Sequence, residues 1–145
     1  MKRFLVVLLV INFLSCKNSE EEKVEKKKVE YDLYQPSEMA LHMEYMFKYN
    51  EQLKQNILEG KELSGFPEDF LKIHTAELTN RFERDQNFES FSELYINAEK
   101  EIFNPDSNVP VEERFNTMVN LCISCHQTSC TGPIPRIKKL IIPQT

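Results

Sequence analysis

The chain has 145 residues, a length that suits one domain together with an export signal. Hydrophobic residues make up 41% and charged residues 28%, as in a folded globular domain, and three glycines with no tryptophan favour helix. The formal net charge is −5 and no basic stretch alternates with aromatic residues, which excludes nucleic acid from the expected partners.

The first segment, residues 1–15, predicts a signal peptide. Lys2 and Arg3 form a basic start, and the apolar stretch that follows is too short to span a bilayer comfortably. Its end and Cys16 resemble a bacterial lipobox, although Phe13 stands where leucine is commoner. The resemblance implies cleavage before Cys16 and lipid attachment to it, and therefore a lipoprotein of the bacterial cell envelope that faces the periplasm. The alternative is an ordinary secretory signal or an uncleaved anchor.

Residues 16–33 are expected to be the lipidated cysteine and a disordered, charged tether. Positions 17–30 hold almost only Lys, Glu and small polar residues, which cannot bury enough apolar area to offset the entropy of the chain. The run from Ser19 to Glu22 resembles the acidic signal that sends some Gram-negative lipoproteins to the outer-membrane surface. A solvated charge run explains it equally well, so both envelope locations stay open.

Three amphipathic helices are predicted next, each from apolar residues at steps of three and four. The first covers Ser37 to Glu59, with Ser37 as its N-cap and Gly60 as its stop. The second covers Pro67 to Asn80, and the third runs from Asn87 to Phe103, before Asn104-Pro105. The expected core residues are Met39, Met43, Met46, Leu53, Ile57, Phe66, Phe70, Ile73, Leu78, Phe88, Phe91, Tyr95, Ala98 and Ile102.

The fourth predicted helix begins near Pro110, and its core-facing row is Val111, Phe115, Met118, Cys122 and Cys125. The prolines after Gly132 are expected to prevent any continuation of helix, and the tail from Arg136 to Pro143 is expected to pack over one end of the bundle. The predicted fold is all-α: an antiparallel four-helix bundle over residues 34–145, with a Pro-rich C-terminal tail.

Cys122-Ile123-Ser124-Cys125-His126 is a C-x-x-C-H sequence, the attachment pattern of c-type haem. Two thiols one helical turn apart can add to the two vinyl groups of one porphyrin, and the histidine that follows is then placed under the iron. The sequence therefore predicts one covalent haem c at Cys122 and Cys125, with His126 as iron ligand. The alternatives are a dithiol redox pair, a zinc site that includes Cys130, and plain disulfides.

A helical chain with C-x-x-C-H on its last helix resembles the class II cytochromes c, the cytochrome c′ group, over roughly Pro36 to Cys130. The resemblance implies a four-helix bundle with haem among the helices, His126 as proximal ligand, and a distal position faced by the first helix. The favoured distal ligand is Met46 or Met43, before Met39 and with His42 as a further candidate. A methionine ligand implies electron transfer, whereas an open site implies binding of a gas such as NO or CO.

Two features depart from that family: a longer tail and the extra Cys130, which has no obvious disulfide partner and is expected to be a buried small residue. Arg136, Lys138 and Lys139 are expected on a solvated basic patch or, alternatively, near the haem propionates, and His74 is expected on the surface.

The expected function is that of a monohaem one-electron carrier tethered to the envelope, and not an enzyme. Its expected partners are redox proteins, the membrane through the lipid anchor, and a second copy in a homodimer. The alternatives are a gas-binding cytochrome and a zinc-binding or structural lipoprotein without haem.

Overall fold

The structure, a computed structural model, describes residues 35–143, and in this range it is all-helical with no strand. The elements are α2 (Glu38–Leu58), η1 (Glu68–His74), α3 (Gln86–Ile102), α4 (Val111–Ser129), α5 (Ile134–Ile137) and η2 (Lys138–Leu140). The predicted all-α class is confirmed. The predicted signal peptide, Cys16 and the charged tether lie outside the described residues. Within residues 35–143, no helix combines the length and the apolar character that a membrane span needs.

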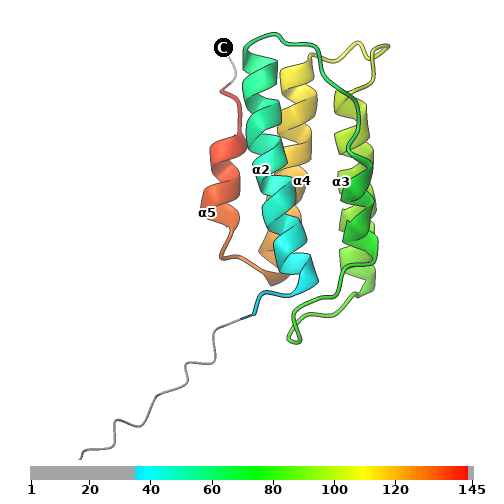
Figure 1. Cartoon of the computed structure of the whole chain (residues 1–145), viewed down its shortest axis with the longest axis vertical. Helices are drawn as coiled ribbons and strands as arrows, with labels where there is room; N and C mark the ends of the chain where they lie inside the picture. Colours follow the sequence, from blue (N-terminus) through cyan, green and yellow to red (C-terminus); the bar gives the residue numbers. More distant parts are fainter. Residues whose placement is uncertain (1–34, 144–145) are drawn as a thin grey trace, which may run out of the picture. The chain divides into compact units, whose positions relative to one another are not determined.

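The three long helices run along one another, with α4 opposite in direction to α2 and α3 (Figure 1). The segment between α2 and α3 contains η1 and returns alongside α3, so it connects two parallel helices (Figure 1). The closest helix pair is α3 with α4, while η1 packs on both α2 and α3. The C-terminal α5 and η2 pack on α4, and η2 also contacts α2.

Both predicted ends of α2 are confirmed. Ser37 is the N-cap: its Oγ accepts a hydrogen bond from the Ala40 N–H at 3.2 Å. At the other end Gly60 adopts a φ of 62°, which lets the Gly60 N–H bond to the Ile57 carbonyl and the Lys61 N–H to the Asn56 carbonyl. Helix α2 therefore ends where a residue without a Cβ permits the left-handed turn.

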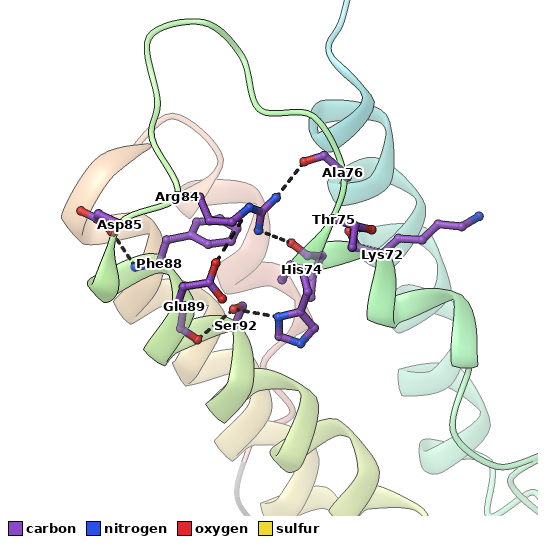
Figure 2. Close-up of polar contacts among 10 residues, drawn as sticks. Lys72, His74, Thr75, Ala76, Arg84, Asp85, Phe88, Glu89 and Ser92 are labelled. Carbon is purple, nitrogen blue, oxygen red and sulfur yellow. Dashed lines mark hydrogen bonds and ion pairs between the residues drawn. The ribbon is translucent and has the colours of Figure 1, made fainter.

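The second predicted helix is a short 3-10 helix, η1, and residues 75–85 contain no helix. The carbonyls that a longer helix would use internally are taken by other elements. Arg84 donates to the carbonyls of Ile73 and Ala76 at 2.9 and 2.8 Å (Figure 2). The Glu77 carbonyl accepts from the Met39 N–H at 2.9 Å, which joins this segment to α2. Tertiary hydrogen bonds therefore replace the last turns that periodicity predicts.

Phe70 of η1 is the centre of the core. It is fully buried, and its ring contacts aromatic rings from α2, α3 and the preceding loop: His42, Tyr45, Tyr49, Phe66 and Tyr95. Most of these contacts are edge-on, the geometry that aromatic quadrupoles favour. A single phenylalanine thus joins η1 to both neighbouring helices.

Helix α3 starts one residue earlier than predicted, because Asp85 caps it by accepting a hydrogen bond from the Phe88 N–H at 2.7 Å. Its buried face is Ser92, Tyr95, Ile96, Glu99 and Ile102. The predicted face is shifted: Tyr95 and Ile102 are buried, whereas Phe88, Phe91 and Ala98 are only half-buried. Ser92 and Glu99 therefore occupy buried positions, whereas hydrophobicity alone predicts that their neighbours Phe91 and Ala98 lie there.

The C-terminal segment differs from the prediction in two ways. Pro133 and Pro135 lie at the start of the short helix α5, where a missing N–H costs nothing, so helix resumes after the break. The segment packs along α4 and against α2, and not over one end, with Ile137, Leu140 and Ile142 buried. Lys54 of α2 donates to the carbonyls of Lys139 and Ile141 at 2.9 and 3.0 Å and holds it there.

Candidate haem-binding site

The C-x-x-C-H motif lies in the second half of α4. Glu112 and Glu113 in the first turn favour this helix through its dipole, and Phe115, Met118, Val119 and Ile123 form its buried face. The helix ends at Ser129, and Cys130 leaves the helical region with φ −135° and ψ 74°. The motif is therefore held on a regular helix that packs on α3.

The two cysteines of the motif are not equally deep. Cys122 is half-buried and packs against the core, and its Sγ donates a weak hydrogen bond to the Met118 Sδ at 3.7 Å. Cys125 is also half-buried but lies outside the core cluster, and Ile123 takes the next core position. The prediction that both sulfurs continue the core row therefore fits Cys122 better than Cys125.

Both thiols are protonated at neutral pH. Burial raises the pKa of Cys122 far above its usual range, and the carboxyl group of Glu99 raises it further. Burial raises the pKa of Cys125 too, with smaller contributions from Asp85 and Cys130. Thiol pairs that act by disulfide exchange depend on a lowered pKa, so this environment does not favour a dithiol redox pair.

Neither a disulfide nor a zinc site is preformed in the described part of the chain around the motif. Cys122, Cys125 and Cys130 form no disulfide with one another. Among residues 35–143 no three His, Cys, Asp or Glu side chains gather in a way that could hold a metal ion. A four-ligand zinc site made of these cysteines and His126 would therefore require the end of α4 to rearrange.

His126 is oriented by the backbone at the end of α4. Its Nδ1 lies 2.8 Å from the Cys130 carbonyl oxygen, and because a carbonyl only accepts, Nδ1 carries the proton. The Cys130 N–H bonds in return to the His126 carbonyl at 3.1 Å. This pairing leaves the lone pair on Nε2. Histidines that bind metals commonly donate their other ring N–H to a backbone carbonyl in this way.

These residues fit the haem that the motif implies. Cys122 and Cys125 stand one turn apart as protonated thiols, the form that adds to a vinyl group, and the Nε2 lone pair of His126 follows directly. Cys130 was expected to matter through its thiol. In the structure its main-chain carbonyl orients His126 instead. A histidine three residues before a helix end is the sequence signal that could have indicated this hydrogen bond.

The distal candidates of α2 are placed differently. Met39 and Met46 are 5% and 6% exposed, whereas Met43 is half-buried. His42 is buried, and its Nε2 faces the Phe70 carbonyl at 3.4 Å, which leaves only Nδ1 with a free lone pair. Burial lowers the pKa of His42 below its usual value, so the ring is neutral at neutral pH. His42 would therefore have to leave Phe70 before its Nε2 could bind iron.

A cluster of buried polar side chains is a feature that the sequence patterns do not predict. Asn50 of α2 and Tyr95 and Glu99 of α3 are almost completely enclosed, and the Asn50 Nδ2 donates to the Tyr95 hydroxyl at 3.3 Å. Asn50, Tyr95 and Glu99 are called the buried polar cluster below. Asn50 interrupts the apolar stripe of α2, and a polar residue on such a stripe is the signal that can mark a buried network.

The basic side chains of the C-terminal segment, expected on a solvated patch or near the propionates, are partly paired and partly exposed. Arg136 forms a two-pronged ion pair with Glu44 and lies over the Phe47 ring, 3.8 Å from its centroid. Lys138 and Lys139 are exposed. His74 is half-buried, with its Nδ1 3.4 Å from the Ser92 hydroxyl (Figure 2).

Two surface hollows lie away from the motif. One, of about 480 Å³, lies between α2 and η2 and is lined mainly by charged and amide side chains such as Lys48, Glu51 and Lys54. The other, of about 540 Å³, lies between α4 and the C-terminal segment. Neither includes a residue of the C-x-x-C-H sequence.

Comparisons of the chain with models of protein families, with curated proteins and with solved structures find no match.

Proposed function

We propose that this protein is a monohaem c-type cytochrome that carries one electron between redox proteins of the bacterial envelope. Haem c would be bound through thioethers at Cys122 and Cys125, with His126 as the proximal iron ligand. When bound, this group supplies an iron that exchanges one electron. The observation that supports the proposal most strongly is the hydrogen bond from the His126 Nδ1 to the Cys130 carbonyl, since it leaves Nε2 free directly after the paired cysteines.

The fold supports the proposal in its coarse features. The four-helix organisation of the class II cytochromes c is proposed with η1 in the place of the second helix. The motif lies on α4, and α2 offers Met46 as the buried distal candidate and Met43 as the alternative. Two protein ligands hold iron in one geometry in both oxidation states, as electron transfer requires.

The first experiment is to express the full chain with cytochrome c maturation machinery and record its absorption spectrum, oxidised and reduced. Sharp low-spin bands on reduction, retained by the denatured protein because the haem is covalent, are expected. The Cys122→Ala and Cys125→Ala variants should each lose one thioether, and His126→Ala should lose the low-spin spectrum. Cys130→Ala is the matched control and should keep covalent haem. A wild-type chain that stays colourless would overturn the proposal and favour the non-haem lipoprotein.

The distal ligand is tested with volume-conserving variants. Met46→Leu should remove the Met–iron charge-transfer band of the oxidised protein, whereas Met39→Leu, at an equally buried position on the same helix, should keep it. If Met46→Leu keeps the band and Met43→Leu removes it, Met43 is the ligand. High-spin bands in the wild type that shift when CO is added would replace the electron carrier with a gas-binding protein.

The location is proposed from the sequence alone: lipid on Cys16 anchors the protein to a membrane of the envelope. Cys16→Ala should move the protein from the membrane fraction to the soluble fraction without changing its haem spectrum. If wild type and variant fractionate alike, the lipoprotein proposal fails and the cytochrome proposal stands.

A further inference from the structure

Glu99 is the most unusual buried residue of the described chain. It is 0% exposed, and neither carboxylate oxygen has a hydrogen-bond partner. The Oδ1 of Asn50, in the same cluster, also lacks one. Buried polar groups are almost always paired, because an unpaired one loses its hydrogen bonds to water and gains none in return. Three unpaired acceptor atoms in one cluster therefore need an explanation.

The missing component is a proton. Glu99 as a carboxylate only accepts hydrogen bonds, whereas as a carboxylic acid it has an O–H to donate. That O–H could bond to the Asn50 Oδ1, and the hydroxyl of Tyr95, which already accepts from the Asn50 Nδ2 at 3.3 Å, could donate to the other carboxyl oxygen. One added proton thus offers a partner to each unpaired atom of the buried polar cluster.

The groups that face Glu99 offer no compensating cation. Its titratable neighbours are Tyr95 on α3, Tyr49 on α2 and Cys122 on α4, whose pKa values its charge raises. On η1, Glu68, Asp69 and Lys72 are exposed, and His74 bonds to Ser92 two turns away along α3. On α4, Arg114 bonds to backbone carbonyls at the end of α3. With no ion pair, burial raises the pKa of Glu99 to about 8.

The position of the cluster relates it to the proposed cofactor. Glu99 lies on α3, which packs on α4, and its charge raises the pKa of the Cys122 thiol, the group that would carry the haem. Charges in an apolar interior interact much more strongly than in water. The charge of the iron and the protonation of Glu99 would therefore influence each other.

We propose that Glu99, supported by Asn50 and Tyr95, is a proton-binding site: under alkaline conditions, where it is ionised beside the oxidised haem, it takes up one proton when the haem is reduced. The inference rests on the proposed cytochrome function. On reduction, one electron comes from the donor redox protein and one proton from water; the Glu99 carboxylate forms an O–H bond with that proton. On oxidation the electron goes to the acceptor protein and the O–H bond breaks, returning the proton to water. The protein then moves an electron and a proton together.

The test is the midpoint potential of the haem-loaded protein, measured by spectroelectrochemical titration from about pH 6 to about pH 10, the range around the pKa of Glu99. In wild type the reduction equilibrium should weaken with pH, at most tenfold for each pH unit, which for one electron is about 59 mV. Glu99→Gln should remove this dependence and keep the visible spectrum. The matched control is Glu93→Gln, an exposed glutamate on the same helix, which should keep it.

A coloured wild-type protein whose potential is flat over this range, or a Glu99→Gln variant with the wild-type slope, would overturn the inference and leave the cytochrome proposal intact. A colourless wild type overturns both. If Glu99→Gln does not fold, the redox difference infrared spectrum of wild type decides. A carboxylic C=O band that appears on reduction and shifts in D₂O supports the proton site, and its absence refutes it.

Discussion

His126 and Cys130 are joined by two hydrogen bonds: the imidazole Nδ1 of His126 donates to the Cys130 carbonyl at 2.8 Å, and the Cys130 N–H donates to the main-chain carbonyl of His126 at 3.1 Å. The ring orientation is therefore set by backbone at the helix end. Because no side-chain atom of Cys130 takes part, the sequence at this position is constrained by conformation and not by the thiol.

This arrangement predicts opposite outcomes for two substitutions of Cys130. Cys130→Ala keeps both bonds, so stability and haem spectrum should match wild type. Cys130→Pro removes the N–H and forces φ towards about −65° from the observed −135°, which should cost about 1–3 kcal/mol and reorient His126. Urea unfolding and the absorption spectrum measure the two effects. Equal behaviour of both variants would contradict the role given to the peptide group.

The raised pKa of Glu99 predicts that the folded protein is less stable at alkaline pH. Its pKa is about 8 in the folded protein against an ordinary 4.5, so the folded state binds its proton more tightly than the unfolded state does. Its contribution is complete below about pH 4.5 and is lost as the pH rises through 8. The expected loss is on the order of 4–5 kcal/mol, at about 1.36 kcal/mol per pH unit.

Urea unfolding at about pH 5, 7 and 9 checks this loss. Glu99→Gln cannot ionise, so its stability should stay flat where wild type declines. The exposed Glu93→Gln should decline with wild type. Parallel curves for Glu99→Gln and wild type would show that folding does not raise the pKa of Glu99.

Arg84 is predicted to hold the irregular segment after η1. Its guanidinium donates to the Ile73 and Ala76 carbonyls and stacks on Phe88 (Figure 2). Arg84→Ala should destabilise the fold by about 2 kcal/mol, and Arg84→Lys should recover only part, because an ammonium cannot reproduce the planar fork.

Thermal or urea unfolding compares these variants with Arg81→Ala, an exposed arginine nearby in sequence that should change stability by less than about 0.5 kcal/mol. If Arg84→Lys restores wild-type stability, the charge matters and the two carbonyl contacts do not.

Asn116 is predicted to fasten the C-terminal segment to α4. Its amide both donates to the Ile142 carbonyl and accepts from the Ile142 N–H, each at 2.8 Å. Asn116→Ala should cost about 1–3 kcal/mol and make the bonds after Lys138 and Lys139 easier for trypsin to cut. Thr117→Ala, an exposed neighbour, should leave the cleavage rate unchanged. An unchanged rate in Asn116→Ala would mean that apolar packing alone holds the segment.

The features predictable from the sequence are local ones. Ser37 and Gly60 mark the ends of α2 because capping depends on the residue itself and its immediate neighbours. Periodicity likewise identifies the three long helices to within one or two residues at most ends. The C-x-x-C-H sequence is equally local, and the structure adds the hydrogen bond that orients its histidine.

The features that escaped prediction depend on distant partners. The early end of η1 depends on Arg84, which lies ten residues beyond it, and on Met39 in another helix. Glu99 lies in the core although its residue type predicts exposure, because the surroundings of α3 are decided by α2 and α4. No periodicity contains that information.

The contact between Lys54 and the carbonyls of Lys139 and Ile141 joins positions 85 and 87 residues apart. During synthesis α2 leaves the ribosome long before Lys139 and Ile141 are made. The contact therefore closes a loop of at least 85 residues. Contacts of such long range slow folding much more than they change final stability. The C-x-x-C-H sequence therefore emerges before α2 can gain its last partners. For that interval Cys122 and Cys125 belong to a chain whose tertiary contacts are not yet complete.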